Sequence, residues 1–144
     1  MKRQNIVMIV IAVFVVLVVG YFAIGYFGIS EEYSEIAGPV GYVDVSAMEA
    51  KELIDNYPDL IIIDVSPVYA DGHLPRAVNY YIGDGSLDAT IPTLDKTAMY
   101  LVYCHVFTAS SSVAQKLVDA GFENVYRLDG EYDAWVDAGY EIVM

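Results

Sequence analysis

The sequence predicts an α/β fold, a five-stranded parallel β-sheet flanked by helices, preceded by one transmembrane helix. Residues 6–29 carry no charge, which predicts the transmembrane helix. In the rest of the chain, short apolar runs alternate with helical patterns. The runs are continuously apolar, as is typical of parallel strands covered on both faces. Strands that alternate with helices imply right-handed parallel crossovers and a layered α/β architecture.

The uncharged N-terminal segment is the first element. Its 24 residues would form a helix roughly 36 Å long, enough to cross a hydrocarbon core of about 30 Å. Lys2 and Arg3 precede it and three glutamates follow it, so the positive-inside rule places the N-terminus in the cytoplasm. A cleaved signal peptide is the alternative, but residues 23–25 make a poor cleavage site. We expect residues 1–29 to be a single-pass anchor in the cell membrane, with an extracytoplasmic C-terminal domain.

An acidic linker, residues 30–39, leads into a domain at residues 40–144. After residue 29 the chain has five Lys and Arg side chains against 20 acidic ones, a formal charge of −15. Nucleic-acid binding needs clustered cations, so this charge excludes a nucleic-acid partner. The remaining length suits one domain rather than two.

The domain contains five predicted strands, at residues 41–45, 60–64, 77–80, 99–103 and 124–127. Ser46 and Glu49 form the pattern of a capping box, which predicts a helix running to Asn56. Residues 110–120 place apolar side chains on one face and end at Gly121, a normal helix stop. Residues 131–138 form the last predicted helix.

Cys104 is the one cysteine, so no intramolecular disulfide can form. It directly follows the predicted strand at residues 99–103, and ligands bind beyond the carboxyl ends of strands in open parallel sheets. We expect backbone amides of the loop at residues 105–109 to point at the sulfur and to lower the pKa of Cys104. The alternative is a small buried apolar residue at a strand end.

Two groups of motifs resemble the rhodanese family. Residues 60–65 (LIIIDV), Tyr69 and residues 72–79 (GHLPRAVN) are similar to its first signature, D-V-R … E-Y … G-H-I-P-G-A-x-N. Residues 102–104 (VYC) and 121–131 (GFENVYRLDGE) are similar to its second, Y-C … G-F-x-N-V-Y-x-L-x-G-G. The resemblance covers about residues 40–142.

The resemblance implies a single rhodanese-like module that is a sulfurtransferase. Active members take sulfane sulfur from a donor onto the loop cysteine as a persulfide and pass it to a thiol or to cyanide. Here Cys104 would be the nucleophile. The substrate-binding cradle would consist of His105, Val106, Phe107, Thr108, Ala109 and Ser110. The implied partners are a sulfane-sulfur donor and a thiol acceptor, and no cofactor is implied.

The loop departs from the pattern of many active members. Ala109 stands where they have Arg, and Phe107 where they have Gly. Without the guanidinium there is no bidentate partner for a sulfonate, so we expect a donor other than thiosulfate, such as a persulfide or polysulfide. His105 and Thr108 are the candidate replacement donors. Ser110 excludes the C-x5-R chemistry of phosphatases.

Three other residues are candidates for lesser roles. We expect Asp64 and His73 to order loops through hydrogen bonds, and Arg76 to face the cysteine pocket. Two histidines and one cysteine exclude a zinc site. Two further functions stay open: a catalytically weak or inactive module that binds a protein partner, and a thiol-based redox sensor at Cys104.

Overall fold

The computed structural model describes residues 41–106 and 109–144. The predicted anchor and linker lie outside these residues, as do Phe107 and Thr108 of the predicted cradle. Among the described helices, none has the length and apolar character needed to span a bilayer.

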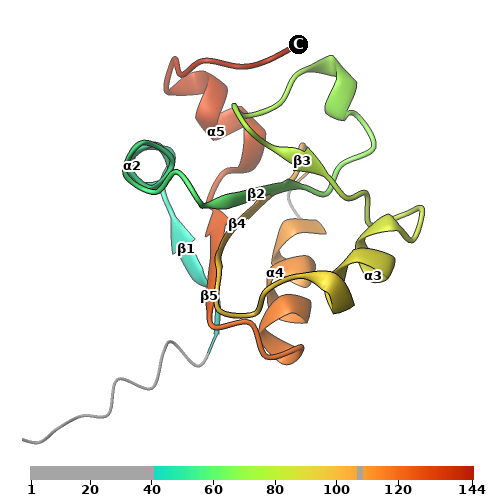
Figure 1. Cartoon of the computed structure of the whole chain (residues 1–144). Coiled ribbons are helices and arrows are strands. Elements are labelled where there is room, and N and C mark those ends of the chain that lie inside the picture. Colours follow the sequence, from blue (N-terminus) through green and yellow to red (C-terminus); the bar gives the residue numbers. More distant parts are fainter. Residues whose placement is uncertain (1–40, 107–108) are drawn as a thin grey trace, which may run out of the picture. The chain divides into compact units, whose positions relative to one another are not determined.

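The described residues form one sheet of five parallel strands, as the sequence predicts (Figure 1). Along the chain the strands are β1 (Val43–Val45), β2 (Ile61–Asp64), β3 (Val78–Asn79), β4 (Met99–Tyr103) and β5 (Asn124–Leu128). Their order across the sheet is β1-β5-β4-β2-β3, so β4 lies at the centre. Each strand lies within about two residues of its predicted position.

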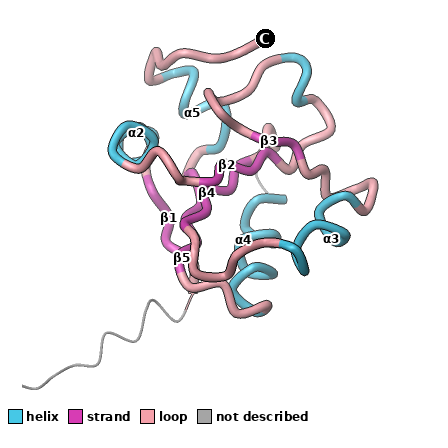
Figure 2. Tube along the Cα trace, viewed as in Figure 1, coloured by secondary structure: helices cyan, strands magenta, loops and turns pink. Residues whose placement is uncertain are grey.

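Helices cover both faces of this sheet. They are α2 (Ala47–Asn56), α3 (Ser86–Thr90), α4 (Ala109–Asp119) and α5 (Glu131–Asp137), with short 3-10 turns at Tyr69–Asp71 and Ile91–Thr93. α3 and α4 pack on one face, and α2 and α5 on the other (Figure 2). The predicted capping box of α2 is present, since Ser46 and Glu49 each bind the backbone N–H of the other.

Strand β4 shows why a buried parallel strand is continuously apolar. Tyr100 and Val102 join the core cluster under α3 and α4, while Leu101 and Tyr103 join the cluster under α2 and α5. All four side chains are fully buried. Because both faces of the strand are covered, apolar and aromatic side chains occupy successive positions along it, and the two tyrosine hydroxyls are hydrogen-bonded to the backbone.

The parallel arrangement brings the carboxyl ends of the strands to one edge. Asp64, the last residue of β2, lies beside Tyr103, the last residue of β4. The N–H of Val65 donates to the Tyr103 carbonyl at 3.1 Å, which continues the pairing past both strand ends. Cys104, the residue that follows the central strand β4, therefore lies at this edge.

Candidate functional site

Cys104 follows β4 directly and is buried. Only 1% of its surface is exposed, and it belongs to the core cluster that also contains Ile63, Val65 and Val113. The sulfur is therefore placed at the end of the apolar core, beyond the carboxyl end of the central strand, as the sequence predicts.

The protonation of this thiol differs from the sequence-based expectation. The N–H groups of His105 and Val106 point at the sulfur and favour the thiolate. Burial has the larger effect, and the carboxylates of Glu131 and Asp64 add to it, so the pKa of Cys104 is raised rather than lowered. The expectation of a lowered pKa was wrong because it counted the amide dipoles and not the loss of water around the sulfur.

The start of α5 holds the peptide groups of Cys104. The Cys104 N–H donates to Glu131 Oε2 at 2.8 Å, and the Cys104 carbonyl accepts from the Tyr132 N–H at 3.0 Å. The Ser110 hydroxyl, in the first turn of α4, donates to the other oxygen of the Glu131 carboxylate. One carboxylate thus binds both ends of the loop that carries the cysteine.

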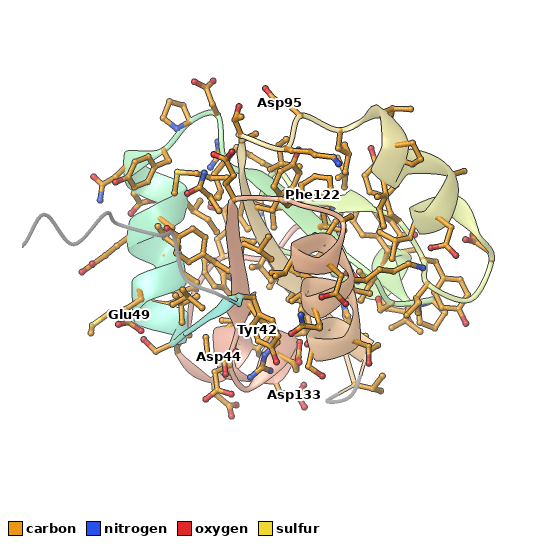
Figure 3. The ribbon with its side chains drawn as sticks, turned by 90° about the horizontal axis from the view of Figure 1, so that it is seen from below. Tyr42, Asp44, Glu49, Asp95, Phe122 and Asp133 are labelled. Carbon is orange, nitrogen blue, oxygen red and sulfur yellow. The ribbon has the colours of Figure 1, made fainter. Side chains whose placement is uncertain are left out.

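A guanidinium from β5 balances this buried carboxylate. Arg127 Nη1 lies 3.2 Å from Glu131 Oε1, and the two side chains are 7% and 5% exposed. The same guanidinium contacts Asp44 at 2.6 Å and Asp129 at 3.2 Å. Asp44 projects from β1 in Figure 3, far from Asp95, which precedes β4 at the other end of the sheet. These acids, Asp44 above all, raise the pKa of Arg127, so it stays charged.

His105 lies between Asp64 and Tyr132. Its ring stacks on the Tyr132 ring at a centroid distance of 3.9 Å and an interplanar angle of 15°. Its Nε2 lies 3.4 Å from Asp64 Oδ2, and neither atom forms a hydrogen bond among the described residues. Asp64 also accepts the Ser66 N–H through Oδ1 at 2.8 Å, so it orders the loop after β2 as expected.

The remaining cradle residues separate into two groups. Val106 is exposed and Ala109 is half-buried at the start of α4. Ser110 is fully buried and is directed at Glu131. The structure therefore joins Cys104 and Ser110 to α5 by hydrogen bonds and His105 to α5 by ring stacking, and it leaves Val106 at the surface.

No cation of the described residues faces the thiol. Lys51 pairs with Asp55, Lys116 with Asp88, and Lys96 binds the Ala120 carbonyl. The expectation that Arg76 faces the cysteine pocket was wrong. Arg76 donates to the carbonyls of Pro58 at 2.5 Å and Ile54 at 2.8 Å, before β2 begins and thus at the opposite edge of the sheet.

Sequence reasoning missed the buried pair Arg127 and Glu131. Two signals were available. Arg127 is the charged residue of an otherwise uncharged predicted strand, and Glu131 occupies the second Gly position of the L-x-G-G motif. The second signal has a physical basis, because Glu131 has a φ of +60°, a conformation that favours glycine.

Comparisons with known proteins agree with this architecture. A rhodanese-like domain is matched over residues 46–138. The thiosulfate sulfurtransferase GlpE of Coxiella burnetii is 35% identical over 96 residues, which cover 65% of this chain and 87% of that protein.

Two solved structures illustrate the similarity of fold. The Alr3790 protein of Anabaena sp. is 27% identical with a TM-score of 0.62, covering 69% of this chain and 80% of that one. The polysulfide-sulfur transferase homodimer of Wolinella succinogenes is 21% identical with a TM-score of 0.60, covering 71% and 78%. This last likeness concerns the fold alone.

Proposed function

The chain belongs to the rhodanese-like domain family, and from this premise we propose that it transfers sulfane sulfur through a persulfide on Cys104. The observation that carries the proposal is the position of the sulfur. It follows the central strand at the carboxyl edge of the sheet, and the N–H groups of His105 and Val106 are directed at it. Such amides stabilise the negative charge that a thiolate or a persulfide places at that point.

The transfer consists of two displacements. The Cys104 thiolate attacks the outer sulfur of a donor R–S–SH, the bond between the two donor sulfurs breaks, and R–S⁻ leaves and takes a proton. Cys104 now carries the persulfide. An acceptor thiolate then attacks the outer sulfur of that persulfide and releases the Cys104 thiolate. The sulfane sulfur changes carrier without net oxidation or reduction.

The charges around the sulfur favour a donor other than thiosulfate. Asp64 and Glu131 are the carboxylates that act on the thiol, and Arg127 is already bound to three acids. A sulfonate group would need a free guanidinium in this place. A persulfide or polysulfide has no sulfonate to bind and is the donor class that we propose.

We further propose that residues 1–29 anchor the protein in the cell membrane, with the domain outside the cytoplasm. The 24 uncharged residues and the preceding Lys2 and Arg3 support this orientation. Washing membranes with alkaline carbonate tests the anchor. The full chain should stay in the pellet and a chain without residues 1–29 should not, and equal release of both would refute it.

Intact-mass measurement tests the sulfur chemistry. The full-length chain in mild detergent, treated with polysulfide and then desalted, should gain the mass of one sulfur, about 32 Da. The Cys104→Ser variant should gain nothing, and thiosulfate at the same concentration should load far less wild-type protein. A wild-type chain that gains no sulfur from polysulfide would contradict the proposal.

A second candidate function is a non-catalytic module that binds a protein partner. The observation that favours it is the burial of Cys104 together with its raised pKa. In that case the thiol fills the core, and Cys104→Ser should capture the same partner from membranes as the wild type. Loss of the captured partner in that variant would instead assign the sulfur a role in binding.

A further inference from the structure

Glu131 adopts a backbone conformation that is costly for a residue with a side chain. Its φ of +60° lies in the left-handed region, where a glycine would fit with less strain. The preceding Gly130 also has a positive φ, of 74°. The presence of a glutamate rather than a glycine at position 131 implies that the contacts of its side chain offset the backbone strain.

Those contacts all involve the loop or its counter-charge. Oε2 accepts the Cys104 N–H at 2.8 Å, and Oε1 accepts the Ser110 hydroxyl and lies 3.2 Å from Arg127 Nη1. Glu131 is 4% exposed, so these bonds form away from bulk water, where each is stronger. Cys104 precedes the loop and Ser110 lies in the first turn of α4, the helix that follows it, so the carboxylate joins the two sides of the loop.

The next residue extends the same attachment. The Tyr132 N–H donates to the Cys104 carbonyl, and the Tyr132 ring covers the His105 ring. The backbone N–H and the backbone carbonyl of Cys104 are therefore hydrogen-bonded to two consecutive residues of α5. These hydrogen bonds fix the direction of the backbone amides that point at the sulfur. The loop has Phe107 at a position where many active rhodaneses have glycine.

We propose that Glu131 is a positioning residue that fastens both ends of the Cys104 loop and sets the charge against which the thiol ionises. The inference rests on the proposed function, because it concerns the same sulfur. Glu131 acts on the reaction through Cys104 and does not itself bind the donor. The charged or titratable groups around the thiol are Glu131 from α5, Asp64 from β2, His105 from the loop and Arg127 from β5 behind Glu131.

Three variants of the full-length chain separate the two parts of this role. Glu131→Gln keeps an oxygen for the Cys104 N–H and removes the charge. Glu131→Gly removes every contact and relieves the strain at φ +60°. Asp133→Asn is the matched control, because Asp133 is an exposed acid two residues along the same helix (Figure 3). Alkylation reports on Cys104 alone, since the chain has no other cysteine.

Each variant has a distinct expected result. In Glu131→Gln the pH midpoint of alkylation should fall by about half a unit, a roughly threefold gain in thiolate below the midpoint. In Glu131→Gly the loop is released, so sulfur loading from polysulfide should fall at least about tenfold while alkylation at neutral pH becomes faster. Asp133→Asn should match the wild type in both measurements.

Unchanged alkylation profiles and loading rates in both Glu131 variants would overturn the proposal. If Glu131→Gly fails to fold by circular dichroism, Ser110→Ala replaces it, because it removes one arm of the attachment and should slow loading severalfold. If the wild type takes up no sulfur, the proposed function fails, and the alkylation profile alone decides the role of Glu131. A downward shift in Glu131→Gln then supports it and no shift refutes it.

Discussion

The ring of His105 stacks on the ring of Tyr132 at 3.9 Å, and this contact joins the residue after Cys104 to helix α5. The loop is thus attached to α5 by its backbone, through Cys104, and by a side chain, through His105. Asp64 of β2 meets the other edge of the imidazole. The site is therefore a junction between a loop, a strand and a helix.

The first prediction concerns the ionisation of Cys104. Burial raises its pKa above that of a free thiol, so alkylation of the folded chain should have a midpoint above about 8.5, and the urea-unfolded chain should have one near that value. The folded state holds the thiol proton more tightly. The contribution of the protonated Cys104 thiol to the free energy of unfolding is therefore complete below the pKa of this thiol in the unfolded chain. It is lost as the pH rises through the pKa of the thiol in the folded chain. A folded midpoint below the unfolded one would contradict the burial described above.

The second prediction concerns the buried ion pair. Arg127→Met leaves the Glu131 carboxylate buried without its counter-charge, and should lower the free energy of unfolding by about 3–5 kcal/mol. Urea denaturation followed by tryptophan fluorescence measures this. The double variant Arg127→Met with Glu131→Gln should recover part of the loss, because it leaves no buried charge. A single variant as stable as the wild type would show that the pair does not hold β5 to the loop.

The third prediction concerns His105 and Asp64. His105→Phe keeps the stacking on Tyr132 and removes the nitrogen that lies 3.4 Å from Asp64 Oδ2, a buried oxygen with no hydrogen bond among the described residues. The expected loss of stability is about 1–3 kcal/mol. A double-mutant cycle with Asp64→Asn should give a coupling energy of at least about 0.5 kcal/mol. Additive effects would mean that the two side chains do not interact.

The fourth prediction concerns donor choice. Ala109→Arg places a guanidinium at the loop position where many active rhodaneses carry one, and a charge-assisted hydrogen bond is worth about 1.5–3 kcal/mol. Sulfur loading from thiosulfate should therefore rise about tenfold or more, while loading from polysulfide should change little. Ala109→Gln, of similar size without the charge, serves as the control. An equal response in both variants would contradict the account of donor choice.

The fold could be predicted from the sequence because its signals are local. The apolar run of residues 99–103 and the capping box at Ser46 each specify their element without help from distant residues. Helix α3 was missed because it has five residues and begins after Gly85, which offers no side-chain cap.

The site could be predicted only in part. The position of Cys104 could be predicted because it directly follows the apolar run of a parallel strand, whose carboxyl end is where ligands bind. The pairing of Glu131 with Cys104 joins residues 27 positions apart, and its direction depends on the unusual φ of Glu131. The hydrophobic periodicity of a sequence does not predict a contact between two residues so far apart. The raised pKa of Cys104 was missed for a related reason, since burial depends on packing from several elements at once.

Discharge of the loaded protein tests the central claim most directly. The full-length chain is loaded with polysulfide, separated from the donor and mixed with a low-molecular-weight thiol, and the intact mass is followed with time. We predict that the added mass of about 32 Da is lost from Cys104 while the acceptor gains one sulfane sulfur for each that the protein loses. A mass that never appears, or that stays on the protein in the presence of the acceptor, would contradict sulfur transfer through Cys104.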